Sequence, residues 1–294
     1  MTEVKTKRQS ASLDRRKLLA DPIMVTTIVV LIAFLTLFIL YPLAILLVDS
    51  FYSKNGLTLD IFKRVLAMAN FRTSIVNTLK VGFLVGILST LLGLLFAYVE
   101  VYVKLGKFSG GLFKVVSMLP VVSPPFVLSL SMIMLFGKAG LITRFLLKIY
   151  DNNVYGFWGI AIVQTLTFFP VCYMMLKGLL KNIDPSLEEA ARVDGARTWT
   201  TFWKVIFPIM KPMHATVAVL TGLAVWNDVM TPLVIMGGSG VNTLPLAQMT
   251  FQTTFGTDYS LAFASYLLAM LPMIIFYIFA QKQIIGGVTN GAVK

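Results

Sequence analysis

The chain has little of the residue chemistry on which most enzymes and metal sites depend. It contains one cysteine, Cys172, and one histidine, His214. A single thiol excludes a disulfide within the chain and disfavours a thiolate metal site. The sequence also has no H-E-x-x-H pattern, no nucleophile elbow and no G-x-x-x-x-G-K-[ST] loop that would cradle nucleotide phosphates. We therefore expect that this chain is not an enzyme and does not itself hydrolyse ATP.

Charged residues are also scarce, at 13% of the chain, whereas 57% of the residues are hydrophobic and the mean hydropathy is +0.82. A water-soluble globule of this composition would lack the polar surface to cover itself. Uncharged stretches reach the roughly 20 residues that cross a bilayer, where backbone groups need helical hydrogen bonds. We expect an all-α membrane protein, a six-helix transmembrane bundle with spans at Ile23–Val48, Val81–Val99, Val115–Gly137, Asn152–Leu176, Met213–Met236 and Tyr259–Gln281.

Acidic residues are fewer than basic ones. The chain has 13 Asp and Glu and 25 Lys and Arg, which gives a net charge of +12. The basic residues are divided among short loops rather than gathered on one face, which favours membrane topology over nucleic-acid binding as their role. The loops on the side of both termini hold most of them. The positive-inside rule therefore predicts a multi-pass protein of the bacterial cytoplasmic (inner) membrane with both termini in the cytoplasm.

The chain divides into three parts. We expect a cytoplasmic N-terminal arm at 1–21, a transmembrane domain at 22–281 and a cytoplasmic C-terminal tail at 282–294. The first apolar stretch is too long for a signal peptide, which predicts a retained first span. In the third span, the proline-rich segment Leu119–Pro125 predicts either a packing kink or a bend that lines a passage.

A polar insert at 182–208 separates the fourth and fifth apolar stretches. Asp184 or Ser186 can cap a first helix, whose early turns carry carboxylates that the helix dipole favours. Gly195 can adopt a left-handed conformation and end this helix. A second short helix is expected to follow and to stop before Pro208. The insert is therefore predicted to be a cytoplasmic helix-turn-helix with a sharp elbow.

The first helix of the insert has the features of a docking element. Ala190 and Ala191 give one flank a low profile that fits a groove on a partner. Glu189 and Arg192, three residues apart, leave charged groups for pairing at its edges. The alternative interpretation is an ordinary polar surface helix between two spans.

The spacing within the insert resembles a coupling signature. Glu189-Ala190-Ala191 is followed after three residues by Gly195, and nine residues later Val205-Ile206-Phe207-Pro208 begins. This pattern is similar to that of the permease subunits of type I binding-protein-dependent ABC importers, and the six spans and the place of the insert fit the same family. The resemblance implies that an ATPase is coupled through Glu188, Glu189, Ala190, Ala191, Asp194, Gly195 and Pro208.

The same resemblance implies what such a permease works with. It would translocate a solute that an extracytoplasmic binding protein delivers, and it would pair with a second permease subunit in the lipid bilayer. Two cytoplasmic ABC ATPase subunits would bind ATP and Mg, so this chain itself needs no cofactor and no metal. No nucleic acid is expected among its partners.

Two parts of the chain resemble different branches of that family. One resemblance is to the carbohydrate branch, which includes the smaller permease of the maltose importer. It is carried by Val193–Ala196, by Trp226–Asp228 with Pro232-Leu233, and by Thr243–Leu246 through Gly256–Asp258 to the ending Gly287–Lys294. Leu119–Leu128 is instead similar to permeases for ferric iron or another small anionic solute. We expect a sugar or oligosaccharide as the solute, with ferric iron or a small anion as the alternative.

Four residues within the apolar stretches are candidates for the solute pathway: Gln164, Trp226, Asn227 and Asp228. A carboxylate inside the membrane is costly unless it is hydrated or paired. An indole offers a flat face to a sugar ring, and an amide can both donate and accept hydrogen bonds. The alternative is that these groups form the hydrogen bonds that hold helices together.

A glycine-rich loop between the fifth and sixth stretches contains Gly238, Ser239 and Gly240. By composition alone it is a flexible turn. The family resemblance implies that it enters the cleft of the binding protein and helps to dislodge the solute.

A secondary transporter driven by an ion gradient is a second alternative for the whole chain. Such a protein would need charge pairs or proton-relay residues within the membrane. Asp228 is the only carboxylate within the apolar stretches, so the sequence favours the ATP-driven importer.

Overall fold

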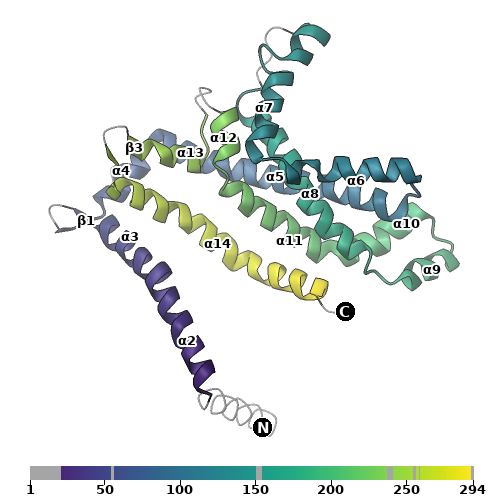
Figure 1. Cartoon of the computed structure of the whole chain (residues 1–294), viewed down its shortest axis with the longest axis horizontal. Helices are drawn as coiled ribbons and strands as arrows, with labels where there is room; N and C mark the ends of the chain where they lie inside the picture. Colours follow the sequence, from purple (N-terminus) through teal and green to yellow (C-terminus); the bar gives the residue numbers. More distant parts are fainter. Residues whose placement is uncertain are drawn as a thin grey trace.

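The computed structural model describes residues 21–53, 56–149, 154–236, 241–253, 256–257 and 259–292. The predicted N-terminal arm, apart from Asp21, and the loop at 238–240 lie outside these ranges. Nearly all described residues are helical, which confirms the predicted all-helical membrane fold (Figure 1). Among them, five helices are long and apolar enough to cross a membrane, and a sharply bent pair of helices would make a sixth.

The first span is one helical rod whose first part stands apart from the bundle. It comprises α2 (Pro22–Leu35), the π-helical turn η1 (Thr36–Leu40) and α3 (Tyr41–Phe51). The Asp21 carboxylate caps its start by accepting a hydrogen bond of 3.0 Å from the Ile23 N–H. Figure 1 shows α2 leaving the bundle while α3 packs against the last helix, α14 (Tyr259–Ala292). No side chain of α2 is buried.

Short elements follow at the end of the bundle that lies farthest from the polar insert. The strands β1 (Tyr52–Ser53) and β2 (Gly56–Leu57) pair antiparallel and lead into α4 (Asp60–Ala67). Ile61 and Val65, four residues apart on α4, are buried against the bundle. This connection therefore closes one end of the protein with a small amphipathic helix.

Three long helices form the centre of the bundle: α5 (Ala69–Tyr102), α8 (Phe157–Leu180) and α11 (Phe207–Trp226). Helices in lipid associate closely where small residues let their backbones approach. A Cβ atom added to Gly93 of α5 would lie 2.7 Å from both the Cβ of Cys172 and the backbone nitrogen of Tyr173 in α8. One added to Gly86 would lie 2.8 Å from the Ala218 carbonyl oxygen of α11. Glycines on α5 therefore set how closely α8 and α11 pack against it.

The third predicted span is broken rather than continuous. α6 (Lys107–Val122) and α7 (Pro125–Phe136) meet at an angle of 109°. Pro124 and Pro125 have no N–H to continue the hydrogen-bonding of α6, and a residue before a proline avoids the helical conformation. The proline-rich segment is thus a sharp bend, followed after α7 by the π-helical turn η2 (Ile142–Leu146).

The fifth span begins earlier and ends earlier than the sequence predicts. α10 (Thr198–Thr201), the π-helical turn η3 (Phe202–Ile206) and α11 form one continuous helix, so the expected stop before Pro208 is wrong. The Phe207 N–H bonds to the Phe202 carbonyl, five residues back, and this widened turn accommodates the proline that follows. α11 then ends at Trp226, and the rest of the predicted stretch is a separate helix, α12 (Met230–Ile235).

The last part of the chain returns along the bundle. α13 (Leu244–Gln248), the 3₁₀ turn η4 (Met249–Phe251) and the antiparallel strands β3 (Gln252–Thr253) and β4 (Gly256–Thr257) lead into α14. Figure 1 shows that α14 starts at the end that holds α4 and ends toward the end that holds the insert. α14 contains the predicted sixth span and continues beyond it to Ala292.

Candidate functional site

The insert begins with a well-capped helix, α9 (Pro185–Val193), which we call the docking helix. Of the two candidate caps, Asp184 takes the role, because its Oδ1 accepts a hydrogen bond of 2.9 Å from the Ser186 N–H. This hydrogen bond lowers the pKa of the Asp184 carboxyl below its ordinary value. Pro185 occupies the first helical position, where its missing N–H costs nothing.

Gly195 ends the docking helix in a left-handed conformation, with φ of +78°. Its N–H bonds to the Arg192 carbonyl at 3.0 Å, and the Ala196 N–H bonds to the Ala191 carbonyl at 2.9 Å. These two hydrogen bonds form a Schellman motif, which satisfies carbonyls that the helix end would otherwise leave free. The turn then leads directly into α10, so the elbow of the insert depends on this glycine.

Replacing Gly195 with alanine is expected to loosen the end of the docking helix. A Cβ there meets no atom within 4 Å, so the cost comes from the left-handed backbone, about 1 kcal/mol of local stability. Hydrogen exchange should become faster in a peptide that covers 190–197. Gly178→Ala in α8 is the matched control, since that site is equally open and has helical backbone. Equal exchange in both variants would contradict the assignment.

The two adjacent glutamates of the docking helix point to different surroundings. Glu188 is half-buried, and its Oε1 accepts a hydrogen bond of 2.7 Å from the Tyr102 hydroxyl at the end of α5. Glu189 is exposed, and so is Ala190, whereas Ala191 is half-buried. Glu189 is therefore the member of the pair that is available to a partner.

The exposed surface of the insert also includes large apolar side chains that the sequence analysis did not single out. Val193 is 86% exposed and Trp199 is 68% exposed. Asp194 is also exposed, next to Gly195. Exposed apolar groups beside charged ones are typical of a binding surface. The signal available in the sequence was Trp199, an aromatic residue four positions after the helix-ending Gly195.

A charge cluster that the sequence analysis missed lies on α5 two residues before Tyr102, which contacts the docking helix. The Glu100 side chain on α5 is only 9% exposed, and its carboxylate lies 2.8 Å from Lys177 Nζ of α8 and 3.7 Å from Lys114 Nζ of α6. The Tyr173 hydroxyl also donates a hydrogen bond to it. A carboxylate buried to this extent needs such partners to remain charged. The cluster thus joins three helices at the end of the bundle that holds the insert.

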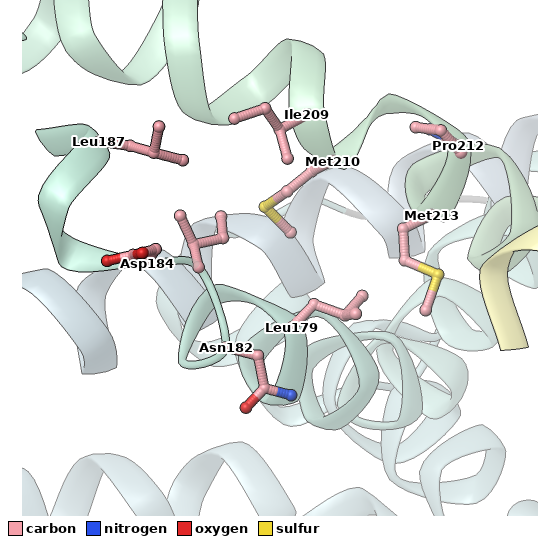
Figure 2. A pocket seen from close by; sticks show the side chains of 9 residues that line it. Leu179, Asn182, Asp184, Leu187, Ile209, Met210, Pro212 and Met213 are labelled. Carbon is pink, nitrogen blue, oxygen red and sulfur yellow. The ribbon is translucent and has the colours of Figure 1, made fainter. Parts of the chain in front are cut away.

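A groove of about 360 Å³ separates the docking helix from the ends of α8 and α11. Figure 2 shows Leu187 on one side of this groove and Ile209 and Met210 on the other. Asn182 and Asp184 supply polar groups at its edge. The docking helix is consequently not packed directly onto α11 along this side.

Of the four candidate pathway residues, the structure joins two directly. Gln164 of α8 is fully buried, and its Nε2 donates a hydrogen bond of 2.9 Å to Asp228 Oδ2. The other oxygen, Oδ1, accepts from the N–H groups of Met230 and Thr231 at 3.0 and 3.3 Å, at the start of α12. Asp228 therefore caps α12 at the break in the fifth span and ties that break to α8. This arrangement favours the interpretation that these groups hold helices together.

The other two candidates border a groove of about 600 Å³ between α11, α13 and α14. Trp226 is buried to 6% exposure, and the exposed Asn227 donates from its amide nitrogen to the Leu223 carbonyl. Gln248, Tyr266 and Tyr277 also line this groove, and its remaining lining is apolar. Aromatic faces and amide groups, without a charged side chain, suit an uncharged polar ligand such as a sugar.

Side chains that commonly bind metals are present in the described part of the chain. There, no group of three or more His, Cys, Asp or Glu side chains is arranged so that it could hold a metal ion. His214 and Cys172 lie within different spans, α11 and α8. The predicted loop residues Gly238, Ser239 and Gly240 are outside the described residues.

Comparison with known proteins relates this architecture to transport proteins. The chain is 33% identical over 269 residues to a putative ferric transport system permease protein, FbpB 1, of Haemophilus influenzae, covering 90% of this chain and 42% of that protein. It is 27% identical over 290 residues to the arabinooligosaccharides transport system permease protein AraQ of Halalkalibacterium halodurans, covering 93% of this chain and 98% of that one. The chain thus spans less than half the length of the ferric relative and nearly all of AraQ.

The fold has a close counterpart among solved structures. A chain of a bacterial ABC transporter involved in the import of the acidic polysaccharide alginate superimposes with a TM-score of 0.76 over 94% of this chain and 97% of that chain, at 15% identity. Residues 82–289 match the family described as the binding-protein-dependent transport system inner membrane component. Since this match covers more than half of the sequence, the chain belongs to the family of binding-protein-dependent transport system inner membrane components.

Proposed function

We propose that this chain is the permease subunit of an ATP-driven importer, which moves a solute delivered by an extracytoplasmic binding protein. The observation that carries this proposal is the docking helix in a member of this family, with Glu189 and Ala190 exposed at one end of the bundle. A small-residue flank beside a free carboxylate fits a cleft on a partner that carries a basic group. That partner is an ABC ATPase, which binds ATP and Mg in its own chain.

A second permease subunit is the partner within the membrane. The first span is Pro22–Phe51, and no residue of its apolar stretch is buried inside this chain. An apolar helix of that length needs either lipid or protein around it. In Figure 1, α2 stands away from the bundle. This arrangement supports the proposal that part of the first span packs against a second permease similar to this one.

The proposed orientation places the insert and both termini in the cytoplasm of a bacterium. The predominance of lysine and arginine on that side supports it through the positive-inside rule. The course of α14 is consistent with it, because this helix ends toward the insert. The external face then holds α4 and α13, where a binding protein would dock.

For the solute, we propose a sugar or oligosaccharide. The groove beside the buried Trp226 supports this choice, because Tyr266 and Tyr277 offer aromatic faces there and Asn227 and Gln248 offer amides, and such groups bind sugar rings well. The match to AraQ over nearly the full length of both chains adds to it. Asp228 accepts hydrogen bonds from Gln164 and from two backbone N–H groups of α12. We therefore propose that it holds α8 and α12 together and does not bind the solute.

Ferric iron is the second candidate, on one specific observation. The relative with 33% identity over 90% of this chain is described as a putative ferric transport system permease. The proline-rich bend between α6 and α7 carries the part of the sequence that resembles such permeases. Iron would then be the cargo of the importer rather than a resident metal.

The solute can be identified with the assembled complex. A tagged chain would be purified from membranes of the source bacterium with its partners, reconstituted in nanodiscs and combined with the binding protein of the same system. We expect a mixture of oligosaccharides to stimulate ATP hydrolysis about fivefold or more, because fivefold is about the smallest effect that two coupled binding sites usually have on each other. Stimulation by ferric citrate alone would favour the second candidate, and a preparation without any ATPase would contradict the importer itself.

A further inference from the structure

We propose that the Tyr102 hydroxyl is the tether that attaches the docking helix to the membrane bundle, so that Tyr102 is a positioning residue for coupling. This inference rests on the proposed function, because coupling needs an ATPase that moves the docking helix. The tether divides the glutamate pair into two roles. Glu188 faces inward and binds α5, whereas Glu189 faces outward and remains free for the partner.

Few other contacts hold the docking helix to the spans, and these are with α10 and η3 of the fifth span. No residue of α9 is buried. Within the described part of the chain, the bond of 2.7 Å from Tyr102 to Glu188 is the one hydrogen bond between α9 and a membrane span. On another side, the groove that Figure 2 shows separates Leu187 from Ile209 and Met210. The tether is therefore the hydrogen-bonded attachment of the docking helix to α5.

The same end of α5 also contacts the second arm of the insert. The Tyr98 ring, one turn before Tyr102, packs edge-on against Phe202 of η3, with ring centroids 4.9 Å apart. The Tyr98 and Tyr102 rings lie 5.0 Å apart along α5. Neighbouring aromatic residues of α5 therefore hold both arms of the insert. Tyr98 contacts the second arm through its ring, and Tyr102 donates a hydrogen bond to the Glu188 carboxylate of the docking helix.

The helix that carries the tether is itself firmly anchored. Glu100, between the two tyrosines, pairs with Lys177 of α8, and the Tyr173 hydroxyl of α8 donates to the same carboxylate. Farther along α5, Gly93 brings the backbones of α5 and α8 together. A displacement of the docking helix that reaches Tyr102 is thus passed to the two helices at the centre of the bundle. Coupling between distant sites travels through such connected, packed contacts.

The test compares Tyr102→Phe, which removes only the hydroxyl, with Tyr98→Phe, which removes a hydroxyl one turn away. Each variant would be made in a Cys172→Ala chain with spin labels at Ser186→Cys on the docking helix and Phe108→Cys on α6, both exposed, and purified with its ATPase. We expect Tyr98→Phe to keep the narrow label-to-label distance distribution of the parent with and without ATP, Mg²⁺ and vanadate. In Tyr102→Phe the distribution should widen about twofold, because the helix loses its attachment.

Activity supplies a readout that a general loss of stability would not reproduce. In Tyr102→Phe we expect the ATPase to be recovered normally and basal hydrolysis to stay within about twofold, while stimulation by the solute-loaded binding protein falls about tenfold. Glu188→Ala should lose the same stimulation, and the double variant should be no worse than either single one. Glu188→Gln, which keeps an acceptor, should retain most of the stimulation.

The outcomes separate this inference from the proposed function. A narrow distribution in both Tyr102→Phe and Glu188→Ala would overturn the tether while leaving the importer intact. A widened distribution with undiminished stimulation would overturn its role in coupling. If the parent chain yields no ATPase at all, the proposed function fails, and the coupling role fails with it.

Discussion

Charge reversal at Glu189 is expected to remove the ATPase from the purified complex. Glu189 is exposed on the docking helix, next to the low flank of Ala190, and it makes no ion pair within the described residues. A lysine there would face the basic group that we propose on the partner ATPase, and such like-charge contacts cost several kcal/mol. We expect recovery of the ATPase with the tagged chain to fall about tenfold or more, measured by quantitative mass spectrometry.

The design separates contact from general charge effects. Asp60→Lys is the matched control, because Asp60 is exposed on α4 at the opposite end of the bundle in Figure 1 and undergoes the same change of charge. Recovery should be unchanged there. Glu189→Gln, which removes the charge without reversing it, should give an intermediate loss. Full recovery with Glu189→Lys would mean that the docking helix does not bind the ATPase through this residue.

Introducing a large side chain at Gly93 is expected to prevent the bundle from folding normally. The first added carbon would already lie 2.7 Å from the Tyr173 backbone nitrogen and 2.9 Å from the Cys172 carbonyl carbon. Backbone atoms in the middle of a packed helix cannot move aside as a flexible side chain can. Gly93→Leu should therefore force α5 and α8 apart, at a cost of about 3 kcal/mol or more.

Gly111→Leu serves as the comparison for this variant. Gly111 lies on the exposed face of α6, and a Cβ there meets nothing within 4 Å. Size-exclusion chromatography and the thermal unfolding midpoint in detergent should show normal protein for Gly111→Leu and aggregated or strongly destabilised protein for Gly93→Leu. Gly93→Ala should be intermediate. Equal behaviour of the two leucine variants would show that the backbones of α5 and α8 do not approach each other closely at Gly93.

Local patterns explain most of what the sequence predicts correctly. A helix cap, a left-handed glycine and an apolar stretch depend on residues within one or two turns, so Asp184, Gly195 and most of the spans follow from spacing and hydropathy. The prediction at Pro208 is wrong for a local reason as well. Proline usually ends a helix, but here a π-helical turn in η3 accommodates it and the helix continues into the membrane.

Hydropathy and capping act over short stretches of chain, so they suffice to predict the helical membrane class, the place of the docking helix and its two ends. Which glutamate is free depends instead on long-range packing, since Tyr102 and Glu188 lie 86 residues apart and meet where their helices pack. The same holds for Gln164 and Asp228, 64 residues apart. Adjacent positions on a helix differ by about 100° in direction, so only the rotation of that helix against its neighbours determines which side chain turns inward.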